Sequence, residues 1–290
     1  MLYLLALGCL FFPGLFLVLK LLLCRAPFRS DREQHATMIA TRLVSSIQAV
    51  MAASAGLLIS SACSQDIMHN QHWLTRAYVL FATPYFAYDI VAMFLCHRCK
   101  MEVKGHQTTP LRSLIGYLQR EFLMVAHHLA MVLICFPVSV FMREGKGDYF
   151  QGVMFLAELS TPSVCLQKIL IQYNQQQSVL YKVNGVVMLG TFFCCRVLLF
   201  PYLYYAYSRY AGIPLYMVPL SVSWQCNAGA FLLMAPQVYW FGLICRGALR
   251  LYTRSHTHAD KLSHTQCTLP HTHAHLAPAN GYKGPHAHTQ

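Results

Sequence analysis

Two adjacent histidines stand in the middle of an apolar stretch, FLMVAHHLAMVLICF, at positions 127 and 128. Burial away from water disfavours the charged form of an imidazole, so His127 and His128 are expected to be neutral rings that can accept a proton or act as nucleophiles. Neighbouring side chains on a helix point about 100° apart, so one ring can face a cavity while the other contacts a neighbouring helix. The plainer interpretation is that both rings only form hydrogen bonds that hold neighbouring helices together.

Two carboxyl groups occur in other apolar stretches of the chain. Asp89 follows Tyr88 in TPYFAYDIVAMF, and Glu158 precedes Ser160 in FLAELSTPSV. Ionisable side chains inside a membrane are costly, and they face the interior of a helix bundle, a cavity or a partner. The proline two residues after Ser160 frees a backbone carbonyl group that a hydroxyl group, water or substrate must satisfy.

One basic residue, Arg196, lies deep in the apolar stretch FFCCRVLLFPYLYY. It is a natural counter-ion for Asp89 or for Glu158. A structural ion pair and a role in binding an anionic lipid headgroup or the phosphates of coenzyme A are both consistent with its position. Three further polar residues are expected to form interhelical hydrogen bonds: Asn184, Asn227 and Gln237.

The composition places these residues in a membrane. Of the 290 residues, 56% are hydrophobic and only 11% are charged, whereas about a quarter of a soluble domain is charged. A spanning helix needs about 20 mostly apolar residues. Seven segments meet this requirement, with six or eight as alternatives, and they predict an all-α, multi-pass helix bundle: 2–23, 38–62, 77–96, 114–141, 149–171, 183–207 and 215–246.

Basic residues cluster in alternate connections between these segments. The formal net charge is +12, and most Lys and Arg residues lie in the connections that follow the first, third, fifth and seventh segments. This bias predicts a lumenal N-terminus and a cytosolic C-terminus. The clusters suit contact with anionic lipid headgroups, and nothing in the sequence indicates that the protein binds nucleic acid.

From about residue 251 the sequence changes character. Residues 251–290 contain eight of the fifteen histidines and few large apolar residues, which predicts a disordered cytosolic tail. Alternating His-x-His could bind Zn or Ni weakly, but a solvated tail is the simpler interpretation. Cys96 and Cys99 form a single CxxC without a second pair, so no metal site is expected there. Together with Cys24 they lie near membrane edges, where palmitoylation is a generic alternative.

A resemblance to the TLC domain rests on three stretches from successive segments: YD at 88–89, HH at 127–128 and ELSTP at 158–162. This homology domain is shared by ceramide synthases and the translocating-chain-associating membrane protein. Four further stretches look similar to the TLC domain-containing protein 3 subgroup: RLVSSIQAVMA, KILIQYNQQ, YKVNG and CCRVLLFPYLYY. The resemblance implies a first span with a cytosolic basic loop (1–32), a TLC domain (33–250) and the His-rich tail (251–290).

The resemblance also implies a reaction. Ceramide synthases of the endoplasmic reticulum join a fatty acyl-CoA to a sphingoid base, and their paired histidines align with His127 and His128. It implies catalysis by these two rings together with Asp89 and Glu158, which would orient the imidazoles or bind the amine. It also implies a substrate site made by Arg196, Ser160 and Tyr88. Fatty acyl-CoA is then a co-substrate, with no tightly bound cofactor. The implied partners are membrane lipids, the sphingoid base, and a second copy or another ceramide synthase, in the endoplasmic reticulum or Golgi membrane.

The stretch around Glu158 departs from the ceramide synthases. They carry His-Asp-x-Ser-Asp on the span after the histidine pair, whereas residues 157–161 read AELST. Ser160 is kept and Glu158 can replace the first Asp, but the His and the second Asp are absent. A non-enzymatic lipid-binding protein that regulates membrane lipid or ceramide metabolism is therefore the alternative function. A proton-coupled transporter is a weaker third hypothesis, because the sequence shows no inverted repeat.

Overall fold

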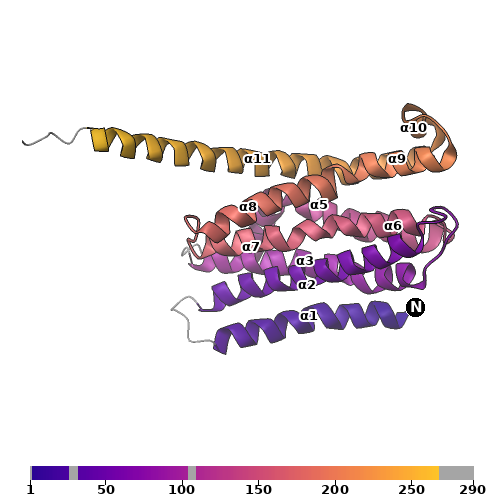
Figure 1. The fold of residues 1–290 in the computed structure, drawn as a ribbon. Coiled ribbons are helices and arrows are strands. Elements are labelled where there is room, and N and C mark those ends of the chain that lie inside the picture. The colour runs from indigo at the N-terminus through magenta and orange to yellow at the C-terminus, as the bar shows by residue number, and fades with distance from the viewer. Residues whose placement is uncertain (1, 26–31, 104–108, 268–290) are drawn as a thin grey trace, which may run out of the picture. The chain divides into compact units, whose positions relative to one another are not determined.

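The computed structural model describes residues 2–25, 32–103 and 109–267. Every regular element in these residues is a helix, so the predicted all-α fold is confirmed (Figure 1). The chain up to Cys245 forms one compact unit, and the residues from Arg246 onward form a second one.

The elements include α-helices, 3₁₀ turns and π-helical segments. In chain order they are α1 (Leu2–Arg25), α2 (Arg32–Ala62), α3 (Trp73–Val103), α4 (Pro110–Arg120), α5 (Phe122–Ala130), η1 (Met131–Cys135), η2 (Val138–Met142), α6 (Asp148–Phe155), η3 (Leu156–Ser160), α7 (Thr161–Gln172), α8 (Val179–Phe192), η4 (Phe193–Val197), α9 (Leu199–Ala211), η5 (Leu215–Met217), α10 (Val218–Ser221) and α11 (Trp224–Cys267).

Seven helical segments are long and apolar enough to cross a membrane, as hydropathy predicts. They are Leu2–Arg25, Glu33–Ala62, Trp73–Glu102, Phe122–Met142, Asp148–Gln172, Val179–Ala211 and Trp224–Arg250. Many large apolar side chains on these helices are exposed, for example Leu10, Leu58 and Phe231. An exposed apolar surface of this kind suits contact with lipid chains rather than with water.

The fourth span begins at Phe122 and not near residue 114 as predicted. The backbone leaves the helix at Glu121 (φ −109°, ψ 20°), so α4 is a separate helix before the span. Arg120 and Glu121 place two charges at this break, with their charged atoms 3.7 Å apart. Charges favour a position at the membrane boundary over one inside the hydrocarbon region, which explains the break.

The seventh span also begins later than predicted, at Trp224 instead of residue 215. Pro214 and Pro219 lie in this part of the chain and have no backbone N–H group to continue a helix. Only the short η5 and α10 form here, and Val222 is extended (φ −86°, ψ 144°) before α11 starts. The prolines therefore shorten the span.

The predicted disordered tail differs from the structure over residues 251–267, which continue α11 as far as Cys267. These residues include no glycine or proline, so the backbone offers no stop to a helix that has already formed. The rest of the predicted tail, residues 268–290, lies outside the described residues.

The long helix α2 packs against α1, α3, α6 and α7. A Cβ atom at Gly56 would lie 2.6 Å from the carbonyl oxygen of Gly152, so the α2 and α6 backbones are in direct contact. Toward the start of α2, Nε2 of Gln172 and Nδ1 of His35 lie 2.8 Å apart. These two contacts fix an antiparallel register between α2 and the α6–α7 span.

Candidate functional site

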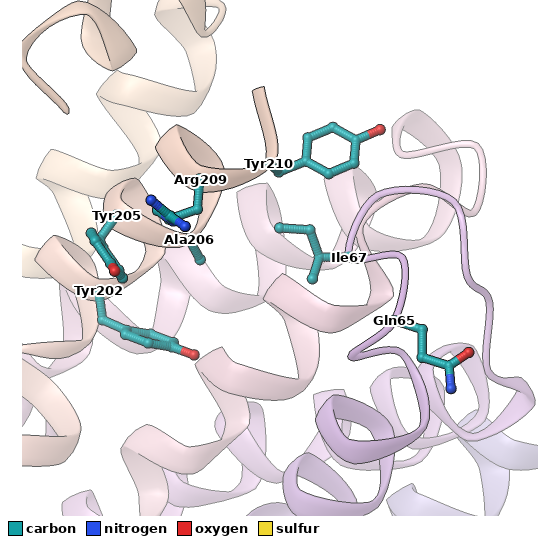
Figure 2. A pocket seen from close by; sticks show the side chains of 7 residues that line it. All are labelled: Gln65, Ile67, Tyr202, Tyr205, Ala206, Arg209 and Tyr210. Carbon is teal, nitrogen blue, oxygen red and sulfur yellow. The ribbon is translucent and has the colours of Figure 1, made fainter. Parts of the chain in front are cut away.

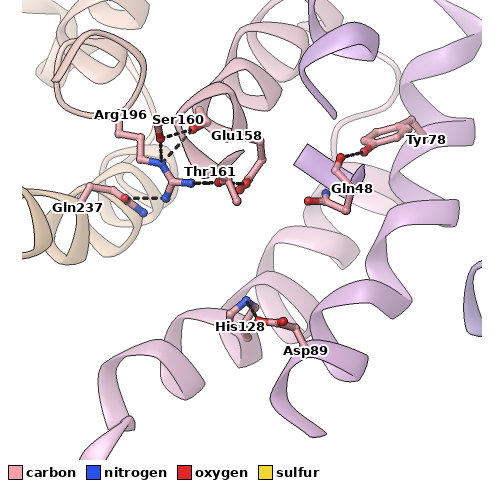
Figure 3. Close-up of polar contacts among 10 residues, drawn as sticks. Gln48, Tyr78, Asp89, His128, Glu158, Ser160, Thr161, Arg196 and Gln237 are labelled. Carbon is pink, nitrogen blue, oxygen red and sulfur yellow. Dashed lines mark hydrogen bonds and ion pairs between the residues drawn. The ribbon is translucent and has the colours of Figure 1, made fainter. Parts of the chain in front are cut away.

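Asp89 and His128 form a buried pair between α3 and α5 (Figure 3). Nε2 of His128 lies 3.4 Å from Oδ2 of Asp89, and the two residues are only 6% and 5% exposed. The hydroxyl group of Ser45 on α2 donates to Oδ1 of Asp89 at 3.4 Å. Three spans therefore meet at one carboxylate.

The second ring nitrogen of His128 determines how many protons the pair needs. Nδ1 lies 3.0 Å from the carbonyl oxygen of Met124 on the same helix. A carbonyl oxygen only accepts hydrogen bonds, so Nδ1 must carry a proton. In a neutral ring Nε2 is then an acceptor, and it faces a carboxylate that also only accepts. The contact becomes favourable when one more proton lies on Nε2, on Asp89 or on a ligand between them.

His127 lies in a different environment. Its ring contacts Trp240 of α11 edge to face, with ring centroids 5.6 Å apart, and its centroid lies 6.0 Å from that of His128. Nδ1 of His127 is buried and has no hydrogen-bond partner within the described part of the chain. The adjacent histidines therefore point to different helices, and only His128 contacts an acid.

The span that carries Glu158 changes its winding before the proline. Pro162 has no N–H group to offer the carbonyl oxygen of Glu158, and this oxygen accepts from the backbone N–H of Thr161 instead. Residues 156–160 consequently form the 3₁₀ turn η3. The Thr161 N–H group is thereby withdrawn from the carbonyl oxygen of Ala157, which it would reach in an α-helix.

Arg196 supplies the missing donor. Its Nε atom donates to the carbonyl oxygen of Ala157 at 2.9 Å and to Oγ of the fully buried Ser160 at 2.8 Å. Arg196 lies in η4, a π-helical segment that interrupts the α8–α9 span. Two irregular segments on neighbouring spans are therefore joined by one guanidinium group. The sequence hypothesis expected a hydroxyl group, water or substrate to satisfy the freed carbonyl group, whereas the structure uses a backbone N–H group and an arginine side chain.

The other guanidinium nitrogens of Arg196 also bind protein atoms. Nη2 donates to Oγ1 of Thr161 at 2.7 Å and lies 3.4 Å from Oε2 of Glu158. Nη1 donates to Oε1 of Gln237 on α11 at 3.0 Å. Of the two counter-ions that the sequence allowed for Arg196, the structure places Glu158 beside it. Because all three nitrogens are engaged, the geometry favours a structural ion pair.

The three polar residues predicted to join helices all do so. Nδ2 of Asn184 donates to the carbonyl oxygen of Ser163 at 2.9 Å and to Gln167 at 2.7 Å. Oδ1 of Asn227 accepts from the hydroxyl group of Tyr204 at 2.7 Å. Gln237 accepts from Arg196, as described above. These bonds link α7 to α8, α9 to α11, and η4 to α11.

Two polar residues of α2, Ser45 and Gln48, were missed by the sequence hypothesis. The side-chain Oε1 of Gln48 is buried and has no hydrogen-bond partner among the described residues, while its backbone carbonyl oxygen accepts from Tyr78 at 3.4 Å. The sequence TRLVSSIQ did indicate a polar helix face, because Thr41, Ser45 and Gln48 recur at helical spacing on one side. The predicted Tyr88 hydroxyl is likewise buried without a partner in the described chain.

Tyr117 connects α4 to α3 near these buried polar groups. Its hydroxyl group donates to the carbonyl oxygen of Ile90 at 3.1 Å, and the residue is 1% exposed. Burial, assisted by the negative charges of Asp89 and Glu121, raises the pKa of Tyr117 to about 12. The phenol therefore stays protonated at neutral pH and keeps its hydrogen bond to α3.

An open depression of about 380 Å³ lies between the α2–α3 connection and α9 (Figure 2). This is the end of the bundle opposite to α4. Its walls combine three tyrosines with one basic residue, and the lining residues are Gln65, Ile67, Tyr202, Tyr205, Ala206, Arg209 and Tyr210. Over the described residues, no three His, Cys, Asp or Glu side chains gather closely enough to hold a metal ion. The buried polar groups of Figure 3 are thus the main candidates for chemistry.

Seven apolar spans that enclose buried ionisable groups define a multi-pass α-helical membrane protein. The family model of the TLC domain matches residues 38–246, and the chain therefore belongs to the TLC-domain family. The chain is also 25% identical over 211 residues to Protein CLN8 of the dog, Canis lupus familiaris. That similarity covers 71% of this chain and 67% of the dog protein. No solved structure matches the chain significantly.

Proposed function

We propose that this protein is a membrane N-acyltransferase of the ceramide-synthase type and a member of the TLC domain-containing protein 3 subgroup. It joins the acyl group of a fatty acyl-CoA to the amine of a sphingoid base. The observation that carries this proposal is the buried pair of Asp89 and His128, which lacks one proton when the ring is neutral. An ammonium group that lies beside the pair and contacts both side chains supplies that proton and a positive charge for the carboxylate.

The geometry suggests a sequence of proton transfers. The substrate ammonium group pairs with Asp89 and gives one proton to Nε2 of His128, which acts as the general base. The free amine attacks the thioester carbonyl carbon, so that a C–N bond forms and the C–S bond breaks. The leaving thiolate takes the second amine proton, and the imidazolium releases its proton to water. The products are the amide, free coenzyme A and one proton.

The other predicted residues take supporting roles in this proposal. His127 is a second candidate base or acyl carrier, since its Nδ1 is unpartnered among the described residues. The buried hydroxyl group of Tyr88 is a candidate contact for a polar substrate atom. Glu158, Ser160 and Arg196 act as positioning residues, because they hold η3 against η4 with every guanidinium nitrogen occupied.

A non-enzymatic lipid-binding function is the second candidate. The stretch AELST lacks the His and second Asp that the resemblance to ceramide synthases leads one to expect. Glu158, which replaces the first Asp, is bound to Arg196 and Thr161. In this version of the proposal the polar interior recognises a lipid headgroup, and the protein regulates ceramide metabolism through association with a synthase.

The proposed location is the endoplasmic reticulum membrane or the Golgi membrane, with the N-terminus in the lumen and the C-terminus in the cytosol. The alternating distribution of basic residues supports this orientation. Fatty acyl-CoA is then a cytosolic co-substrate, and the sphingoid base arrives from the membrane.

The test is ceramide formation by purified full-length protein supplied with palmitoyl-CoA and sphinganine. The double variant His127→Ala, His128→Ala serves as the comparison, and Arg209→Gln, a substitution at the other end of the bundle, serves as the control. We expect turnover by the wild type and the control and at least a hundredfold loss in the double variant. Equal ceramide formation in all three proteins would refute the assignment. Persistence of co-purified lipid without turnover in any of them would favour the lipid-binding function.

A further inference from the structure

Arg42 on α2 and Lys168 on α7 are basic side chains within the spanning segments, and neither has an acidic partner among the described residues. They lie in the segments Glu33–Ala62 and Asp148–Gln172. Neither side chain forms an ion pair or hydrogen bond with any other described residue. Charges inside a membrane span are costly unless a partner compensates them.

The antiparallel packing of α2 and α7 brings the two cations to the same region of the bundle. His35 on α2 contacts Gln172 at 2.8 Å and stacks on the ring of Tyr173, with centroids 6.1 Å apart. Arg42 lies two turns after His35 along α2, and Lys168 lies one turn before Gln172 along α7. Because the helices are antiparallel, both positions lie on the same side of the His35–Gln172 contact. Arg42 is the nearby charge with the largest effect on Lys168, and the carboxylates of Asp89 and Glu121 oppose it more weakly. Two like charges this close increase the need for an anion.

No carboxylate among the described residues forms an ion pair with Arg42 or Lys168. Up to residue 250, all but one of the acidic side chains that the structure describes already have a basic partner. The pairs are Glu33–Lys20, Asp66–His69, Asp89–His128, Glu102–Arg98, Glu121–Arg120, Asp148–Arg143 and Glu158–Arg196. The remaining one, Glu144, lies in the connection before α6, at the opposite end of the bundle. An anionic ligand can therefore serve as their counter-ion.

We propose that Arg42 and Lys168 form an anion site that binds the phosphate group of a ligand from the membrane boundary. A guanidinium group binds phosphate oxygens in pairs, and an ammonium group adds a point charge. Lys168 is exposed and Arg42 is half-buried, so a ligand can reach both. The phosphate can belong to a phospholipid headgroup or to an acyl-CoA.

The site lies close to the buried pair described above. Arg42 is three residues from Ser45, which donates to Asp89, so a phosphate bound here lies about one helical turn from the polar interior. A chain attached to that phosphate can extend toward His128. The inference goes beyond the proposed acyl transfer, because it predicts binding that needs no turnover.

The test uses full-length protein in detergent micelles and radiolabelled dipalmitoyl phosphatidic acid, with dipalmitoylglycerol as the matched probe without phosphate. We expect the wild type to bind phosphatidic acid at least tenfold more tightly than the diacylglycerol. The variant Arg42→Gln, Lys168→Gln should lose this preference, while Arg209→Gln, which removes an exposed cation at the other end, should keep it. If palmitoyl-CoA displaces phosphatidic acid, coenzyme A is a source of the bound phosphate. If palmitoyl-CoA does not displace it, the phosphate belongs to the lipid.

Two results would overturn the site: equal affinity of the wild type for the two lipids, or unchanged preference in the double variant. If the double variant does not fold, the comparison of the two lipids on the wild type still decides. His128→Gln should bind phosphatidic acid normally. Loss of acyl transfer therefore leaves this inference standing, and loss of phosphate binding leaves the proposed reaction standing.

Discussion

Nε2 of His128 lies 3.4 Å from Oδ2 of Asp89 while Nδ1 of the same ring is held by the carbonyl oxygen of Met124. The ring therefore presents an acceptor to another acceptor unless a proton or a cationic group lies between them. Buried polar atoms in proteins almost always find partners, so this arrangement requires an explanation. In the proposed reaction, a substrate ammonium group satisfies both side chains at once.

Replacement of Asp89 by asparagine should separate structure from chemistry. The amide of Asp89→Asn can donate to Nε2 of His128, so the pair no longer needs an extra proton and stability should change by no more than about 1 kcal/mol. The charge that binds the ammonium group is lost, and ceramide formation should fall at least about a hundredfold. Parallel measurements of thermal unfolding and turnover check both parts. Full turnover in a stably folded variant would exclude Asp89 from the reaction.

Replacement of Arg196 by methionine should affect stability first. The substitution removes the donor of the Ala157 carbonyl oxygen and leaves the carboxylate of Glu158 with only the hydroxyl group of Thr161, which should cost roughly 3 kcal/mol. The double variant Arg196→Met, Glu158→Gln should recover part of this loss, because no uncompensated charge remains. Thermal unfolding in detergent measures all three proteins. Wild-type stability of the single variant would show that η3 and η4 do not depend on Arg196.

The sequence predicts the seven spans because each needs only a long apolar run, and it predicts Asn184, Asn227 and Gln237 as interhelical contacts because polar groups in a membrane need partners. It could not choose between Asp89 and Glu158 as the partner of Arg196, because that choice depends on how distant spans pack. It also merged α4 with the fourth span, because apolar residues lie on both sides of Arg120 and Glu121 and these two charges alone did not locate the break. Ser45 was missed although Thr41, Ser45 and Gln48 share one helical face, because the sequence does not show that this face packs against Asp89.

Glycine substitutions on α1 provide a matched test of helix packing. A Cβ atom at Gly8 would lie 2.2 Å from the carbonyl oxygen of Phe81 on α3, whereas one at Gly14 meets nothing within 4 Å. Gly8→Ala should therefore displace α1 and destabilise the protein by roughly 1–3 kcal/mol. Gly14→Ala should be neutral or stabilise by up to about 1 kcal/mol, since alanine favours the helix. Equal unfolding temperatures of the two variants would contradict the close contact of α1 with α3.

The most direct measurement of the central claim compares His128→Gln with His127→Gln in a turnover assay with palmitoyl-CoA and sphinganine. Glutamine keeps a polar group near the original ring but cannot act as a base at neutral pH. We predict that His128→Gln, which removes the partner of Asp89, reduces the rate of amide formation at least about a hundredfold, and that His127→Gln reduces it less. Undiminished amide formation by folded His128→Gln would contradict the account.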